Sequence, residues 1–143
     1  MADDTHIQAE ILTPEGKIFE GELFQVSART VVGEVGIRAR HAPMLARLVP
    51  SELRLYEDQS SFNSGDGDRY VSAEGWLEVF ANKVVVLVEE AHQPGDLDAS
   101  ALRERITECE QRVEEAEEGS AAEDTAKHDL ERAEAFLKAA EGE

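Results

Sequence analysis

The sequence predicts an antiparallel β-sandwich or barrel followed by an antiparallel two-helix hairpin. Between residues 6 and 92, apolar and polar residues alternate in short runs separated by turn residues, without an intervening helical period. After residue 98 the apolar residues recur every three or four positions instead. Gln93-Pro94-Gly95 separates the two patterns. We therefore expect a β domain over 1–92, a linker over 93–97 and a helical hairpin over 98–143.

The first strands are predicted from a hairpin pattern. His6–Ile11 alternates at period two, Thr13-Pro14-Glu15-Gly16 supplies turn chemistry, and Lys17–Glu20 resumes the alternation. The apolar residues of 23–28 and the alternation in 46–57 indicate two further strands.

The segment Gly33–Leu45 is expected to be a shaped loop between strands. Its two glycines permit a positive φ or a close backbone approach, and proline after Ala42 favours extended backbone there. Arg38, Arg40 and His41 form a basic cluster in an acidic chain. This cluster fits either a docking point for another surface or an ordinary solvated turn.

The second half of the β region contains a loop and the most strand-like segment. Ser60–Asp68 is polar and contains glycine, which predicts a hairpin loop. In Tyr70–Val88, Gly75 predicts a bend and Asn82-Lys83 a turn. Val84–Val88 is almost continuously apolar, which predicts a strand buried on both faces.

The last third predicts two helices that pair along a narrow seam. Asp98 is suited to cap the first helix, and Gly119-Ser120 interrupts the helical pattern. The predicted seam residues are Leu102, Ile106, Cys109, Val113 and Ala116 on the first helix, and Ala126, Leu130, Ala133, Leu137 and Ala140 on the second. Four of these ten residues are alanine, so little apolar area is buried when the helices meet. We expect the hairpin to open when a partner offers a better surface.

Acid–base pairs four residues apart are expected to support the helices. They are Glu108 with Arg112, Glu123 with Lys127, and Glu134 with Lys138.

Charge and composition exclude several classes of function. The chain has 32 acidic and 14 basic residues and a formal net charge of −18, which argues against nucleic-acid binding through a basic surface. No apolar run approaches the length of a membrane helix, and the N-terminus has no signal-peptide pattern. The single cysteine, Cys109, is interpreted as a packing residue. The four histidines lack partners at metal-ligand or nucleophile spacing, so we expect no cofactor, metal or catalytic residue.

Several motifs together resemble one family, the epsilon subunits of F-type ATP synthases. The resemblance covers nearly the whole chain, with its parts in the family's order. It rests on Gly33-Glu34-Val35-Gly36-Ile37, His41-Ala42-Pro43-Met44-Leu45, Gly75-Trp76-Leu77-Glu78-Val79, Asn82-Lys83-Val84 and Asp96-Leu97-Asp98.

The resemblance implies a ten-stranded sandwich in the rotor, at the foot of the central stalk, with no catalytic role of its own. Its implied partners are the gamma subunit, the c-ring and, when the tail extends, the catalytic alpha and beta subunits. The implied location is the cytoplasmic face of the plasma membrane, reached through the complex. The residues at positions that face the c-ring in the family are Glu34, Arg38, Arg40, His41, Ala42, Pro43 and Met44.

The resemblance also implies that the tail is a switch, which permits ATP hydrolysis when folded and blocks it when extended. The candidate contacts of this tail are Asp98, Arg103, Arg105, Lys127 and Arg132. Residues 122–140 hold five acids against three bases, whereas the family's second helix often presents positive charge to an acidic segment of the beta subunit. Because like charges repel, we expect weak or salt-dependent inhibition.

Two further positions depart from the family pattern. Relatives have Pro-Gly before His-Ala-Pro where this chain has Ala39-Arg40, so we expect a different turn geometry. Some relatives bind ATP through an Asp followed three residues later by Arg, but Asp98 is followed at that place by Ala101, which argues against ATP binding. A soluble β-sandwich adaptor unrelated to ATP synthase and an ATP-sensing module remain the alternative functions.

Overall fold

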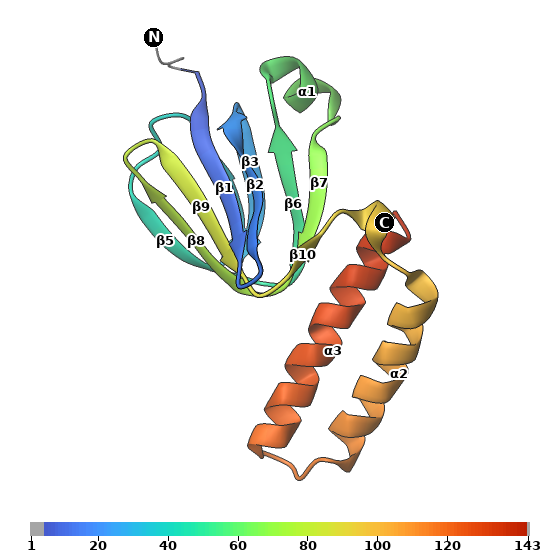
Figure 1. Ribbon diagram of the computed structural model, residues 1–143. Helices are drawn as coiled ribbons and strands as arrows, with labels where there is room; N and C mark the ends of the chain where they lie inside the picture. Colours follow the sequence, from blue (N-terminus) through green and yellow to red (C-terminus); the bar gives the residue numbers. More distant parts are fainter. Residues whose placement is uncertain (1–4, 143) are drawn as a thin grey trace.

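The computed structural model describes residues 5–142, which form ten strands and then a helical hairpin (Figure 1). This confirms the predicted fold class. The elements are β1 (Ile7–Thr13), β2 (Gly16–Leu23), β3 (Gln25–Thr30), β4 (Gly33–Ile37), β5 (Met44–Leu48), β6 (Ser51–Tyr56), α1 (Gln59–Ser64), β7 (Asp68–Ser72), β8 (Gly75–Phe80), β9 (Lys83–Val88), β10 (Ala91–His92), the 3₁₀ turn η1 (Pro94–Asp96), α2 (Ala99–Glu115) and α3 (Ala121–Ala140).

The strands form one continuous sheet that folds over into two facing halves. The strand order is β10-β7-β6-β3-β5-β8-β9-β1-β2, and β4 pairs with β3. The two halves are joined where Thr30 of β3 pairs with Leu48 of β5. The pairing is antiparallel throughout the described strands except between β1 and β9, which run parallel.

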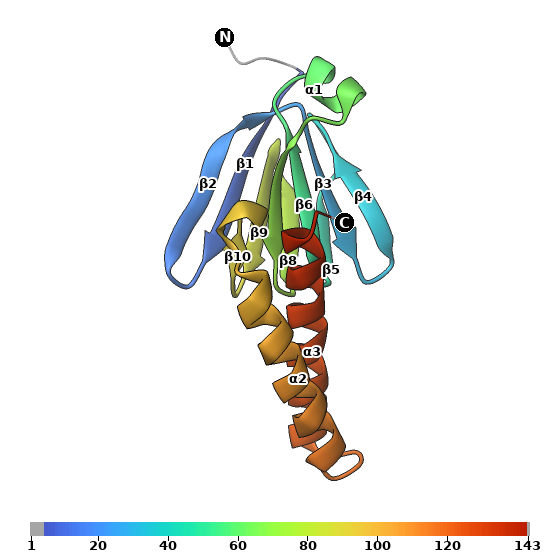
Figure 2. The same ribbon diagram turned by 90° about the vertical axis from the view of Figure 1, so that its right-hand side faces the viewer.

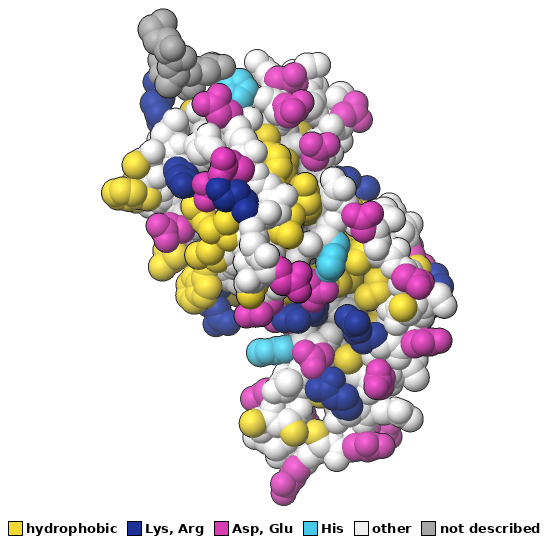
Figure 3. Space-filling model, in the orientation of Figure 1, with side chains coloured by type: hydrophobic (Ala, Val, Ile, Leu, Met, Phe, Trp, Pro, Cys, Tyr) yellow, Lys and Arg dark blue, Asp and Glu magenta, His cyan; other side chains and the backbone are white. Residues whose placement is uncertain are grey.

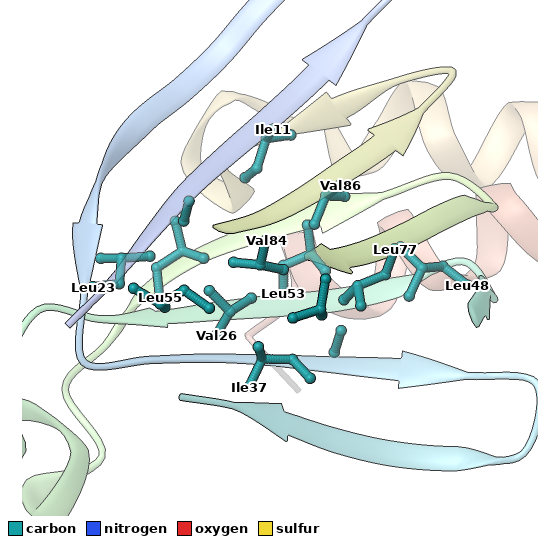
Figure 4. Close-up of a cluster of buried hydrophobic side chains, with 14 of the residues drawn as sticks. Ile11, Leu23, Val26, Ile37, Leu48, Leu53, Leu55, Leu77, Val84 and Val86 are labelled. Carbon is teal, nitrogen blue, oxygen red and sulfur yellow. The ribbon is translucent and has the colours of Figure 1, made fainter. Parts of the chain in front are cut away.

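The core lies between the two halves and is made of the alternate, inward-facing residues of the strands (Figure 4). Ile11 and Val86 come from one half, and Val26, Leu53 and Leu55 come from the other. All five are at most 2% exposed. Burial of this many aliphatic side chains is the main force that holds the sandwich together.

The prediction that Val84–Val88 is buried on both faces is wrong. Val84, Val86 and Val88 are buried, but Leu87 is 42% exposed and Val85 is half-buried. The outer face of β9 is therefore apolar and uncovered. A continuous apolar run indicates two-sided burial only when a second layer covers the strand.

The predicted loop Ser60–Asp68 is also wrong in part, because α1 forms there. Asp58 accepts a hydrogen bond from the backbone N–H of Ser61 at 2.8 Å, and the Ser61 side chain reaches back to Asp58, which makes a capping box. Gly65 ends the helix with φ 75°, the left-handed conformation that glycine favours. Six residues are too few to show a helical period in the sequence.

The predicted loop Gly33–Leu45 contains strand at both ends. Gly33–Ile37 is β4, which forms a hairpin with β3, and β5 begins at Met44. The loop is confined to residues 38–43. Glycines at positions 33 and 36 hid the strand, since glycine is unfavourable in strand interiors.

The two helices pair antiparallel and project beyond one end of the sandwich (Figure 2). Asp98 caps α2 and Ser120 caps α3. Leu102, Cys109, Ala126 and Ala133 are buried, as the predicted seam requires. Of the acid–base pairs expected within helices, Glu123–Lys127 forms at 3.5 Å. Arg112 instead bridges to Asp129 across the hairpin at 2.9 Å.

Candidate protein-binding surfaces

The outer face of β5, β8 and β9 is an uncovered apolar surface, which we call the β8 face. It contains Leu45 (66% exposed), Trp76 (44%), Phe80 (65%) and Leu87 (42%). Strand register places these residues side by side. Trp76 lies opposite Leu87. Leu45 lies opposite Glu78, which stands between Trp76 and Phe80 on the same face of β8. Figure 3 shows apolar side chains gathered over these strands.

Charged groups border the β8 face. The Arg47 guanidinium lies 5.7 Å from the centre of the Trp76 ring. On the neighbouring β1, Glu10 pairs with Lys83 at 3.2 Å and with Lys17 at 3.5 Å. The hydrogen bond from Lys83 lowers the pKa of Glu10, with Lys17 contributing, so this carboxylate stays charged at neutral pH. A shallow cleft of about 580 Å³ is lined by Trp76 and Leu87 at one end of the face. An apolar centre with a charged rim is the usual composition of a protein interface.

The structure separates the predicted c-ring residues into two groups at opposite ends of the sandwich (Figure 2). Glu34 lies near the start of β4, whereas Arg38–Pro43 form the loop after its end. Four residues of extended chain correspond to about 13 Å. Glu34 therefore does not lie with the basic cluster.

At the first end, Glu34 lies beside an exposed apolar turn. Its carboxylate accepts a hydrogen bond from Arg29 at 3.1 Å on the paired strand β3. Val31 and Val32, in the turn between β3 and β4, are 59% and 91% exposed. Two such valines at a hairpin tip fit a contact with another surface.

At the other end, the loop Arg38–Pro43 borders the β8 face. The Arg40 backbone N–H donates to Oδ1 of Asn82, in the turn that follows Phe80, at 2.7 Å. Ala42 and Pro43 are exposed, and Met44 and Leu45 continue the segment into β5. The loop is therefore continuous with the β8 face.

The turn in this loop contains a left-handed residue although it lacks glycine. Arg40 has φ 61°, a conformation that costs non-glycine residues about 1–2 kcal/mol. The Asn82 hydrogen bond holds this conformation in place. Arg40 thus adopts the backbone region that glycine favours.

A third surface is the contact between the hairpin and the sandwich. Phe136 of α3 is 1% exposed. It packs with Val71 of β7 and with Ala73, which directly follows this strand. Its ring also meets His92 edge-on, with centroids 5.6 Å apart. Sequence reasoning missed Phe136 because it lies outside the seam between the helices. A large aromatic residue three positions after seam residue Ala133 was the available signal.

Beside Phe136, Arg132 links α3 to two carboxylates of the sandwich. Its guanidinium bonds to Glu74, in the segment between β7 and β8, and lies 3.7 Å from Glu90. Glu90 also contacts His92 at 2.7 Å. Without Arg132, Glu74 would lose its partner among the described contacts and Glu90 would keep His92 alone.

The other predicted tail residues have roles within the helices. Asp98 caps α2, Arg103 pairs with Glu141 at 3.2 Å, and Lys127 pairs with Glu123. Arg105 is exposed on α2. Arg132 is therefore the predicted tail residue that touches the sandwich.

The Cys109 thiol, a potential nucleophile, is buried. Burial raises the pKa of the Cys109 thiol, which is 2% exposed between the helices and so stays protonated at neutral pH. Within residues 5–142, no three or more His, Cys, Asp or Glu side chains are placed to hold a metal ion. None of the described helices has the length and apolarity needed to cross a membrane.

An uncovered apolar face with a charged rim is typical of proteins that bind other proteins. The family described as "ATP synthase, Delta/Epsilon chain, beta-sandwich domain" matches residues 6–94. The chain belongs to this family of ATP synthase epsilon chains, as the resemblance in its motifs predicted.

Relatives and solved structures agree with this assignment. The chain is 32% identical to the ATP synthase epsilon chain of Halalkalibacterium halodurans and 35% identical to that of Aquifex aeolicus, in each case over 78% of this chain and 80% of the relative. It also resembles a chain of the Euglena gracilis mitochondrial ATP synthase (TM-score 0.78, 21% identity, 97% of this chain and 84% of that chain). A chain of the Tetrahymena thermophila mitochondrial ATP synthase central stalk and c-ring has a TM-score of 0.58 at 17% identity, covering 97% of this chain and 99% of that chain. The two solved structures show that the fold is shared.

Proposed function

We propose that the chain is a non-catalytic rotor subunit of an F-type ATP synthase, which couples proton flow through the c-ring to ATP synthesis. The observation that carries this proposal is the β8 face, because its exposed Leu45, Trp76 and Phe80 need a protein partner. Family membership and the likeness to a central-stalk chain support it. The subunit would be peripheral to the cytoplasmic face of the plasma membrane, attached through the complex.

The gamma subunit is the proposed occupant of the β8 face. The loop Arg38–Pro43 borders that face, so we assign Arg40, His41 and the start of β5 to the same contact. An apolar patch of several large side chains is suited to a stable interface, through which this chain and gamma would rotate together.

The c-ring is the proposed partner of the opposite end, where Glu34 and the Val31–Val32 turn lie. The sequence resemblance assigned seven residues to the ring contact, namely Glu34, Arg38, Arg40, His41, Ala42, Pro43 and Met44. Because a surface that faces one end of the sandwich does not reach the other, we propose the ring contact for Glu34 alone among them.

We further propose that residues 1–92 bind the rotor, 93–97 act as linker and 98–143 regulate ATP hydrolysis. Docked on the sandwich, the hairpin permits hydrolysis; extended, it reaches the catalytic alpha and beta subunits. The docked state rests on the small cluster around Phe136 and on the Arg132 ion pairs, and a small free-energy gap is easily shifted by a partner.

Inhibition of hydrolysis by this tail is expected to be weak. Glu123, Asp124, Asp129, Glu131 and Glu134 give residues 122–140 a net negative charge, which would repel an acidic partner segment. Deleting residues 97–143 should therefore change the ATPase rate of the assembled enzyme only slightly at low salt. A many-fold rise in that rate would contradict the expectation.

The proposed function is tested by affinity purification of the tagged chain from its host, followed by mass spectrometry. Gamma and the other ATP synthase subunits should be recovered with it, in the membrane fraction. Recovery of an unrelated set of proteins from the soluble fraction would favour the adaptor alternative. A shift of the thermal midpoint by millimolar ATP would favour the sensing alternative.

Replacing Arg132 with glutamine should weaken docking of the hairpin. The change removes the charge that pairs with Glu74 and Glu90, and hydrogen bonds to charged groups contribute about 1.5–3 kcal/mol, less where water reaches them. Hydrogen exchange of α3 should become about ten-fold faster. Lys127→Gln is the matched control, because Lys127 pairs only within α3 in the described contacts. Equal exchange in Arg132→Gln and the wild type would show that the pair does not hold the hairpin.

A further inference from the structure

The short helix α1 has no evident task in the core. None of its six residues is buried, and it packs on the rest of the sandwich mainly through Phe62. The Phe62 ring meets the Tyr56 ring at 5.2 Å, edge-on, and the Phe24 ring at 5.9 Å. Burial in the core therefore does not explain the presence of this exposed helix, which has a single aromatic anchor.

That explanation lies in Arg38, the first residue of the loop after β4. Its guanidinium carbon is 4.7 Å from the centre of the Phe24 ring and 4.8 Å from that of Phe62. The guanidinium is therefore within cation–π distance of two aromatic rings, one of which α1 supplies. Its Nε also donates to Oε1 of Gln25 at 2.7 Å, and Gln25 is 8% exposed.

Hydrogen bonds fix the Arg40–His41 part of the same loop. The Arg38 carbonyl accepts from the His41 N–H at 3.1 Å, which closes the turn. Arg40, in its left-handed conformation, donates its N–H to Asn82. Asn82 in turn donates its side-chain N–H to the carbonyl of His6 at 3.2 Å. The loop is thus held from α1 on one side and from the β8–β9 turn on the other.

We propose that α1 is a positioning element that fixes the loop Arg38–Pro43 through the Phe62–Arg38–Phe24 stack, so that the loop meets its partner preformed. This inference rests on the proposed function for the use of the loop, but not for the stack itself. A preformed loop loses less conformational entropy on binding, which raises affinity without any contact between α1 and the partner.

The first test is hydrogen exchange of the isolated full-length chain. Phe62→Ala should speed exchange at the amides of Arg40 and His41 on the order of ten-fold, since one cation–π contact is lost. Asn63→Ala, at the exposed next position of α1, should leave both rates unchanged. Unchanged rates in Phe62→Ala would overturn the proposal.

Two more variants protect this test against a local loss of fold. Phe62→Leu keeps an apolar side chain at the anchor but removes the aromatic face. Arg38→Met keeps the aliphatic stem but removes the guanidinium. Both should retain the unfolding midpoint of the sandwich within a few degrees and still speed exchange in the loop. If they exchange like the wild type, the stack does not position the loop.

The second test measures binding to ATP synthase from which the epsilon chain has been stripped. Phe62→Ala should weaken rebinding about five- to ten-fold through the mobile loop. Faster loop exchange with unchanged rebinding would overturn the role of α1 in the interface. The proposed function fails independently if a charge on the β8 face leaves rebinding intact, whatever Phe62→Ala does.

Discussion

Replacing Phe136 with alanine should release the helical hairpin from the sandwich while leaving the sandwich folded. Phe136 is 1% exposed and forms the centre of the small cluster with Val71, Ala73 and Leu102. Truncating a buried phenylalanine costs about 3–5 kcal/mol. The remaining contacts are small alanines, three leucines of which two are only partly buried, and the Arg132 ion pairs. They are too few to offset that loss, so the undocked state should predominate.

Hydrogen exchange and thiol chemistry can measure this release. The amides of α3 should lose protection, and so should those of Val71 and Ala73, which the hairpin covers. Cys109 is the single cysteine and is buried between α2 and α3, so its rate of reaction with a thiol reagent reports whether the helices also separate. The unfolding midpoint of the sandwich, followed by Trp76 fluorescence, should change little because Phe136 is absent from the main core.

Phe80→Ala is the matched control, since it removes the same side chain from an exposed position on the β8 face. It should leave the exchange of α3 unchanged. If Phe136→Ala keeps α3 as protected as in the wild type, the hairpin is held by the seam and linker alone, and the docking contact described above has no energetic weight.

The parts of the fold that could be predicted are those in which local pattern and tertiary environment agree. The β1–β2 hairpin has alternating residues and a turn containing Pro14, and both are satisfied in the structure. The α2–α3 seam follows the three-four spacing because the two helices cover each other along it. The change from strands to the long helices after Pro94 is visible because a proline-glycine pair interrupts both periods.

The parts that could not be predicted depend on contacts between distant segments. Phe136 is buried against β7 and β10, and the residue pattern of α3 does not predict a contact with these strands. The outer face of β9 is apolar although no described part of the chain covers it, so its pattern imitates a fully buried strand. Glu34 and His41 are close in sequence, but an unrecognised strand between them carries them to opposite ends. Sequence proximity alone therefore does not place these residues at one end of the sandwich.

Replacing Phe80 with glutamate should prevent stable assembly of the chain into ATP synthase. Phe80 is 65% exposed in the free chain, so its charged replacement stays in water and the fold is unaffected. In the proposed complex the same side chain would be buried against gamma. An unpaired carboxylate there costs about 3–5 kcal/mol, which corresponds to a loss of affinity of roughly 150- to 4,000-fold.

Rebinding to stripped ATP synthase measures this loss, with Val32→Glu as a control at the other end of the sandwich. Val32 is 91% exposed and lies on the proposed c-ring side, so it tests whether the two ends have different partners. Val32→Glu should retain binding to isolated gamma, whereas Phe80→Glu should lose it. If both variants bind gamma like the wild type, the β8 face is not its binding site. If both lose it, the division of the surface between gamma and the c-ring is wrong, because one partner then covers both ends.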